Sequence, residues 1–202
     1  MSCNCLAAKV ILLAEGWPQG DALIAKVREE LAGYSLPVPY YPGIHARYAA
    51  FRAAYPGAEA IVPSVPSAAR QGPAAEAAGE ALPWLLNVLP AYPADPMREY
   101  AFRTEPFAPV VTFVKVPCAA GAEQVPSFLA RAVAACNEEI WGTLSCTLLM
   151  HPATEAAHPE AVQKALDGLQ YGSVVVNGWS VLGYLPPQVS DNGRLGWCTA
   201  GG

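Results

Sequence analysis

Two cysteines stand near the amino terminus, spaced Cys-x-Cys in the segment MSCNCLAAKVILL. A cysteine thiolate can attack a carbonyl group, bind a soft metal or exchange with a disulfide. Cys5 precedes a short turn and an apolar, β-branched run at residues 9–14, which predicts a buried strand. A thiol at the edge of such a strand is held in place and still open to solvent, as a nucleophile requires. Three interpretations of Cys3 and Cys5 stay open: a nucleophile, a metal or redox pair, or an accident of composition.

The other candidate metal ligands are scattered along the chain. Cys118, Cys136 and Cys146 fall in a loop, on a helix face and in an apolar strand, where free cysteine packs as a small hydrophobe. Zinc sites generally take paired ligands from two separate clusters, and only one close cysteine pair is present. We therefore predict no metal site. The three histidines are expected to be surface or helix-capping residues: His45, His151 and His158.

The elements that must position these residues follow from apolar periodicity. Strands are predicted at residues 9–14, 82–89, 107–116, 143–150 and 173–177, and helices at 20–31, 44–55, 126–139 and 159–170. The Ala- and Pro-rich stretch 56–81 is expected to be a loop or an insertion. The carboxy-terminal half then alternates strand and helix, which favours an α/β fold with a mostly parallel sheet covered by helices. Residues 186–202 have no periodicity and are expected to form an irregular tail.

Composition excludes several classes of protein. Of the 202 residues, 53% are hydrophobic and 14% are charged, which argues for a well-filled core and against disorder. The net charge is −5 and no basic cluster occurs, so nucleic-acid binding is not expected. Apolar runs are strand-sized, far short of the ~20 residues that span a bilayer, so no membrane partner is expected. No signal peptide is visible, and we expect a cytoplasmic protein with reduced thiols.

Several segments together resemble the aldehyde dehydrogenase superfamily. TEPFAPVVTF (residues 104–113) is similar to the family signature Glu-x-Phe-Gly-Pro-Val, which precedes a strand. AVAACN (132–137) resembles the end of a family helix, WGTLSCTLL (141–149) resembles the following strand, and YGSVVVN (171–177) resembles Gly-x-Val-x-Val-Asn. Upstream, NCLAAK (4–9) is similar to the family segment that carries the catalytic cysteine before a basic residue and a strand.

The resemblance implies a fold, a reaction and site residues. The fold would be the three-layer catalytic domain of that family, over residues 1–185 and incomplete at both ends. Cys5 would be the nucleophile in the NAD(P)-dependent oxidation of a small-molecule aldehyde, through a thiohemiacetal and a thioester. Glu105 would hold the nicotinamide ribose, and Phe107 would pack near the nicotinamide. The partners implied are a further copy of the chain or an amino-terminal cofactor-binding domain.

The departures from the family pattern keep two other readings open. The usual glycine of the signature is Ala108, and no Gly-rich turn for a dinucleotide occurs in the chain. We also identify no general-base glutamate and no asparagine donor for an oxyanion, so the chain alone is expected to turn over an aldehyde inefficiently. The alternative is a non-catalytic remnant of such an enzyme that acts as an interaction or structural module. A thiol redox or metal protein that uses Cys3 and Cys5 is the third reading.

Overall fold

A computed structural model describes residues 4–36, 39–64 and 81–181 of the chain. The chain divides into two compact units, residues 1–116 and residues 117–202. The predicted tail at 186–202 and Cys3 both lie outside the described residues. Within the described ranges, no helix has the length and apolar character needed to cross a membrane.

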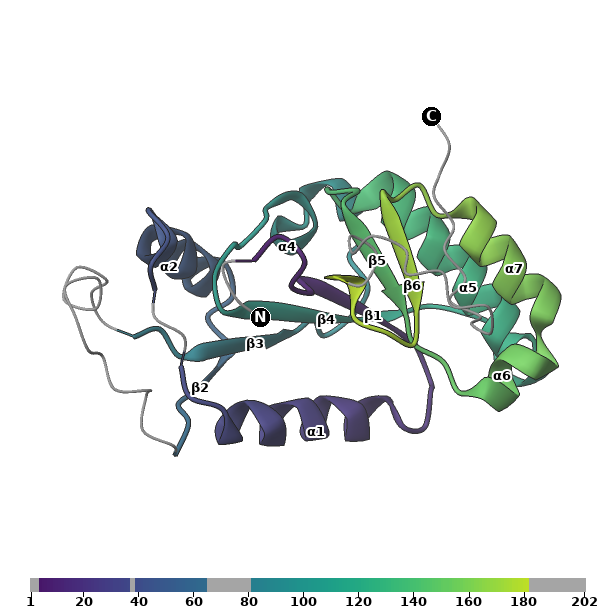
Figure 1. The fold of residues 1–202 in the computed structure, drawn as a ribbon, viewed down its shortest axis with the longest axis horizontal. Helices are drawn as coiled ribbons and strands as arrows, with labels where there is room; N and C mark the ends of the chain where they lie inside the picture. The colour runs from purple at the N-terminus through teal and green to yellow at the C-terminus, as the bar shows by residue number, and fades with distance from the viewer. Residues whose placement is uncertain (1–3, 37–38, 65–80, 182–202) are drawn as a thin grey trace, which may run out of the picture. The chain divides into compact units, whose positions relative to one another are not determined.

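The first unit is built on a four-stranded mixed sheet (Figure 1). Its strands, in spatial order, are β1 (Val10–Ala14), β4 (Val110–Val116), β3 (Trp84–Val88) and β2 (Glu59–Ile61). β1, β4 and β3 run parallel, whereas β2 pairs with β3 in the antiparallel direction. The central strand β4 is buried on both faces, as its continuous apolar sequence predicts. The expected α/β class and the strands near residues 9–14, 82–89 and 107–116 are thus confirmed.

Helices cover both faces of this sheet, because side chains alternate between faces along a strand. Helix α1 (Gly20–Gly33) packs on the face that carries Phe113 and Leu86. Helix α2 (Ile44–Ala54) packs on the opposite face, and the short helices η1 (Pro96–Arg98) and α4 (Tyr100–Arg103) precede β4. Figure 1 shows α1 and α2 on opposite sides of the strands. The predicted helices at 20–31 and 44–55 are confirmed.

One strand lies where the sequence predicts a loop. β2 falls inside the stretch 56–81, of which residues 65–80 are outside the described part of the chain. Its pattern is exposed, exposed, buried, and Ile61 enters the core opposite Trp84. Three residues are too short for a periodic signal, and the edge position on β3 supplies the pairing that makes them a strand. The sheet is therefore mixed: three strands run parallel, and the edge strand β2 is antiparallel.

The second unit contains a two-stranded parallel sheet and two packed helices. Strands β5 (Ser145–Leu148) and β6 (Ser173–Val176) pair with Cys146 opposite Val174. Leu129 of α5 (Gln124–Ala134) packs against Val162 of α7 (Pro159–Gly168). The short helices are η2 (Gly121–Glu123) and α6 (Pro152–Ala157). The predicted strands near 143–150 and 173–177 and the helix near 159–170 are confirmed.

The helix predicted at 126–139 changes its winding near its end. The α-helix begins at Gln124 and ends at Ala134, and a π-helical turn, Ala135–Glu139, follows. Within that turn, the Asn137 side chain donates to the Gly168 carbonyl at 2.7 Å and accepts from the Gln170 amide at 3.0 Å. These bonds tie the turn to the carboxy-terminal end of α7, a tertiary contact that apolar periodicity does not encode.

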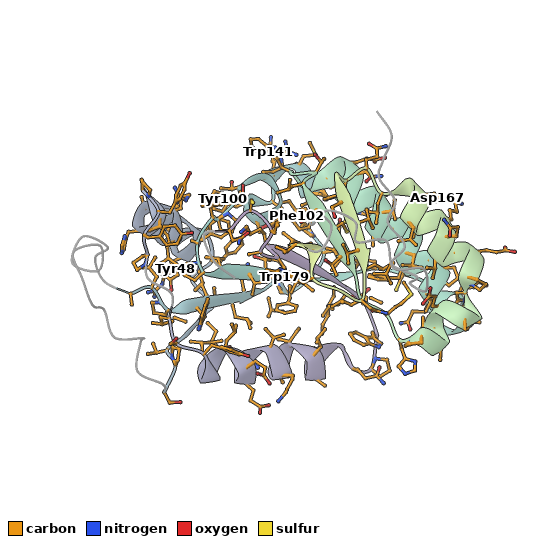
Figure 2. All side chains as sticks on the ribbon, in the orientation of Figure 1. Tyr48, Tyr100, Phe102, Trp141, Asp167 and Trp179 are labelled. Carbon is orange, nitrogen blue, oxygen red and sulfur yellow. The ribbon has the colours of Figure 1, made fainter. Side chains whose placement is uncertain are left out.

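Two tyrosines on one face of the first unit differ in how their hydroxyl groups are satisfied. The Tyr55 hydroxyl donates to the Glu99 carboxylate and accepts from the Ala101 amide at 2.7 Å. Burial, together with the bond to Glu99, raises the pKa of Tyr55, so the phenol stays a neutral donor. The Tyr48 ring is buried between α2 and the sheet (Figure 2), and its hydroxyl has no hydrogen-bond partner within the described residues.

We expect the Tyr55→Phe variant to lose about 1–3 kcal/mol of unfolding free energy, because Glu99 and Ala101 each lose a partner. The matched variant Tyr48→Phe removes an unsatisfied buried hydroxyl, so its stability should be unchanged or slightly higher. Urea denaturation followed by circular dichroism measures both. Equal destabilisation of the two variants would contradict the assigned hydrogen bonds.

Candidate functional site

The segments that carry Cys5 and Glu105 meet at the amino-terminal ends of the neighbouring strands β1 and β4. β1 and β4 are neighbouring parallel strands with Val10 opposite Thr112, so the residues before each strand approach the same edge. The Thr112 amide donates to the Lys9 carbonyl at 2.9 Å and continues this pairing toward the amino ends of the strands. The structure therefore brings together two segments that lie 100 residues apart in sequence.

The Lys9 side chain connects these two segments. Its ammonium donates to the Asn4 carbonyl at 2.8 Å and lies 3.9 Å from the Glu105 carboxylate. The same nitrogen lies 5.5 Å from the centre of the Phe107 ring, within range of a cation–π interaction. Only 16% of the Lys9 side chain is exposed, compared with 56% of Glu105. Lys9 thus contacts both predicted cofactor residues and the residue that precedes Cys5.

Cys5 lies in a tight turn that Asn4 stabilises. The Asn4 side-chain oxygen accepts from the Leu6 amide at 2.8 Å, and its carbonyl accepts from the Ala7 amide at 3.1 Å. An asparagine that bonds its own backbone two residues on is a common device for ordering a turn. The Cys5 thiol is free and exposed. The turn therefore combines an ordered backbone with a solvent-accessible sulfur.

Arg47, on α2, braces the loop that carries Phe107. Its guanidinium donates to the carbonyls of Pro42, Pro106 and Phe107 at 3.1, 3.2 and 3.5 Å. The Phe107 backbone has a φ of 39°, a conformation that costs about 1–2 kcal/mol for a residue with a Cβ. The Phe107 ring packs edge-on against Tyr41 at 4.7 Å between centroids, and Arg47 lies over both rings. These contacts hold the loop in its unusual backbone conformation.

Gly43 gives a test of the backbone next to Arg47, because it caps the start of α2 with a φ of 75°. A Cβ at Gly43 would lie 3.0 Å from the Arg47 Nη1 atom. We expect the Gly43→Ala variant to lose about 1–2 kcal/mol of unfolding free energy from backbone strain, and more where Arg47 must move. Gly57→Ala is the matched control, because Gly57 has no positive φ and an added Cβ meets no atom within 4 Å. Urea denaturation should separate the two variants; equal stability would contradict the left-handed backbone at Gly43 and its close approach to Arg47.

Sequence reasoning identified part of this site. The resemblance pointed to Cys5, Glu105 and Phe107 and to a basic residue before the first strand, which is Lys9. It did not identify Arg47 or Tyr41, whose contribution depends on the packing of α2 against the loop before β4. A single arginine in a surface helix carries no signal that could have indicated this role.

The other histidines and cysteines considered as metal ligands have capping, surface or packing roles. The His151 side chain accepts from the Ala153 amide and caps α6, whereas His45 is exposed on α2. Cys136 and Cys146 are half-buried and pack against Leu169 and other apolar side chains of the second unit. Among the described residues, no cluster of three or more His, Cys, Asp or Glu side chains could hold a metal ion.

Glu105 has the chemistry to hold a ribose. A carboxylate can accept two hydroxyl hydrogen bonds at once. The Glu105 carboxylate is mostly exposed, and the neighbouring Lys9 ammonium lies beyond hydrogen-bond distance from it. Phe107 is half-buried and fixed by Arg47 and Tyr41, so its ring can form a rigid apolar wall next to that carboxylate. The two residues therefore place a hydrogen-bond acceptor and an apolar wall in the same loop.

Comparisons with protein families and with curated proteins found no match.

Proposed function

We propose that this chain is the nucleophile-bearing part of an NAD(P)-dependent aldehyde dehydrogenase, with the three-layer catalytic fold of that family. One observation carries the proposal. The Cys5 turn and the Glu105–Phe107 loop precede adjacent parallel strands, and Lys9 contacts both segments. This juxtaposition supports the proposal, because it joins two segments that lie 100 residues apart in the chain and that the resemblance names.

The chemistry begins at the Cys5 sulfur. An exposed thiolate attacks the aldehyde carbonyl carbon and forms a thiohemiacetal, whose oxygen carries the developing negative charge. NAD(P), when bound, supplies the acceptor for the hydride of that adduct. Glu105 would accept hydrogen bonds from the ribose hydroxyls, and Phe107 would limit the motion of the nicotinamide ring. Lys9 holds the Asn4 carbonyl and the Glu105 side chain near each other, so it is a positioning residue.

Isolated turnover is expected to be slow. Loss of a general base typically costs 10²- to 10⁴-fold in rate, and no base for hydrolysis of the thioester has been identified among these residues. A further domain or a second copy of the chain would therefore be the partner that completes the site. The proposed substrates are small-molecule aldehydes, and the proposed location is the cytoplasm.

Thiol labelling tests the proposal without requiring turnover. In a Cys3→Ser background, iodoacetamide at neutral pH should alkylate the exposed Cys5 well before the half-buried Cys146. Benzaldehyde should slow the labelling of Cys5 and leave that of Cys118 unchanged, because only Cys5 forms the adduct. Peptide mass spectrometry follows each site over time. Labelling of Cys5 that is indifferent to the aldehyde would overturn the assignment.

The nucleotide site has a separate test. NAD(P) should bind weakly to the chain, and Glu105→Gln should weaken binding further because the carboxylate is lost as a bidentate acceptor. Arg98→Gln is a matched control, since it changes one exposed charge outside the site. Titration calorimetry or ligand-detected magnetic resonance measures both. If Glu105→Gln and Arg98→Gln bind NAD(P) equally, Glu105 is not a ribose ligand.

An interaction module is the second candidate, and exposed aromatic surface favours it. In the second unit, Trp141 is 74% exposed, Leu149 is 71% exposed and Trp179 is 62% exposed (Figure 2 labels both tryptophans). Contiguous exposed apolar side chains are typical of surfaces that bind another protein, and each of these three residues is a candidate contact. Light scattering with size-exclusion chromatography tests this: the Trp141→Ser variant should dissociate an oligomer if this surface forms it.

A further inference from the structure

Two cysteines lie together in the second unit, away from the site around Cys5. Cys136 belongs to the π-helical turn after α5, and Cys146 belongs to β5. Their thiols hydrogen-bond each other, and both pack against the cluster formed by Leu169, Tyr171 and Val174. Both thiols are free and half-buried rather than sealed in the core. The fold thus brings two partly accessible thiols into the same apolar cluster, within hydrogen-bonding reach of each other.

The surroundings make the two thiols unequal. The hydrogen bond from Cys146 lowers the pKa of Cys136 against the opposing effect of burial. The same hydrogen bond and burial raise the pKa of Cys146. The Tyr171 hydroxyl donates to the Cys136 carbonyl at 3.1 Å, and burial raises its pKa, so it stays a neutral donor. Cys136 is therefore the sulfur that carries negative charge more readily, with a protonated thiol beside it.

We propose that Cys136 and Cys146 form a reversible dithiol–disulfide site that reacts with hydroperoxides, with Cys136 as the attacking sulfur and Cys146 as the resolving sulfur. Reactive cysteines of this kind combine thiolate character, access to solvent and a neighbouring resolving thiol. All three features are present at this pair. The proposal is independent of the role proposed for Cys5, because it uses other residues in the other unit.

The reaction balances with a hydroperoxide as the oxidant. The Cys136 thiolate attacks one peroxide oxygen, the O–O bond breaks, and the leaving oxygen takes up the proton that the thiol released. The sulfur loses two electrons and becomes a sulfenic acid. The Cys146 sulfur then attacks the Cys136 sulfur, an S–S bond forms, and the sulfenic hydroxyl leaves with the Cys146 proton as water. A small dithiol restores both thiols by exchange and is itself oxidised to a disulfide.

The backbone on each side suits this closure. Cys146 is fixed by the pairing of β5 with β6, opposite Val174. Cys136 lies in the π-helical turn, outside the regular α-helical ladder. Closure requires the sulfurs to move from hydrogen-bond contact to a bond of about 2.05 Å. Turns of this type occur often at functional sites in helices. The adjustment therefore falls on the turn rather than on the paired strand.

Peptide mapping of the full chain tests the proposal directly. The reduced protein is treated with hydrogen peroxide, blocked with iodoacetamide and cleaved after glutamate without reduction. This cleavage, which spares the bond before Pro106, places Cys118, Cys136 and Cys146 on separate peptides, residues 100–123, 124–139 (also as 124–138) and 140–155. We expect peptide 124–139 linked to peptide 140–155, with loss of two hydrogen atoms, and release of the link by dithiothreitol. Links that join Cys118 to either peptide in similar yield would overturn the proposal.

Two variants assign the roles of the sulfurs. In Cys146→Ser the Cys136 sulfenic acid cannot be resolved, so dimedone should label Cys136 about tenfold more than it labels Cys146 in Cys136→Ser. Cys118→Ser is the matched control and should leave the link between Cys136 and Cys146 unchanged. Circular dichroism checks that each variant folds. If a variant does not fold, the peptide map of the wild-type chain still tests whether Cys136 and Cys146 form a disulfide. Equal dimedone labelling in the two variants would show that Cys136 is not the attacking sulfur.

Discussion

The Phe113→Ala variant should lose about 3–5 kcal/mol of unfolding free energy, the cost typical of removing a buried phenylalanine. Phe113 lies in the central strand β4 and is 1% exposed. It packs with Ile24 of α1 and with Leu86 of β3, so the truncation leaves a cavity between the helix and the sheet. Because β4 pairs with both β1 and β3, surrounding side chains have little freedom to collapse into that cavity.

Val88→Ala is the control for the Phe113 variant. Val88 is the register partner of Phe113 on β3, but 38% of it is exposed. We expect a loss well below that of Phe113→Ala, because solvent already reaches Val88 and a smaller cavity forms. Urea denaturation followed by far-ultraviolet circular dichroism gives both values. Comparable losses for the two variants would mean that α1 does not pack on this face.

The Arg47→Met variant is expected to lose about 2–4 kcal/mol of unfolding free energy, since each hydrogen bond to a charged group contributes about 1.5–3 kcal/mol and such contributions are not fully additive. Methionine keeps an unbranched apolar side chain of similar length and removes the charge and all donors. The carbonyls of Pro106 and Phe107 then lose their partner at a position where the backbone already has an unfavourable φ. The loop that carries Glu105 should consequently become more mobile.

Two further variants separate the effect of the Arg47 hydrogen bonds from the effect of losing a positive charge on α2. Arg52→Met removes an exposed charge from the same helix and should change stability by no more than about 0.5 kcal/mol. Arg47→Lys keeps the charge but lacks the planar fork, so its stability should lie between that of the wild type and Arg47→Met. Urea denaturation measures stability, and amide hydrogen exchange at residues 105 and 107 reports the loop. Unchanged exchange in Arg47→Met would contradict the brace.

The sequence by itself determined the elements and their class. Long apolar runs with a clear period, such as residues 9–14 and 110–116, became strands, and residues 20–31 and 44–55 became helices. These segments bury one face or both, and burial of a periodic apolar set is a local property that a sequence displays directly. The exposed, tightly turned Cys5 also follows from its neighbours Asn4 and Leu6, whose contact spans two residues.

Only the tertiary structure decided which distant residues meet. The antiparallel strand β2, the contacts of Lys9 with Glu105 and Phe107, the Arg47 brace and the pairing of Cys136 with Cys146 all join segments from different elements. Each depends on strand order, on register or on how a helix packs against its neighbours. A single sequence carries no periodic signal for such pairings, because the partners are set by the closest packing of whole elements and not by local residue preference.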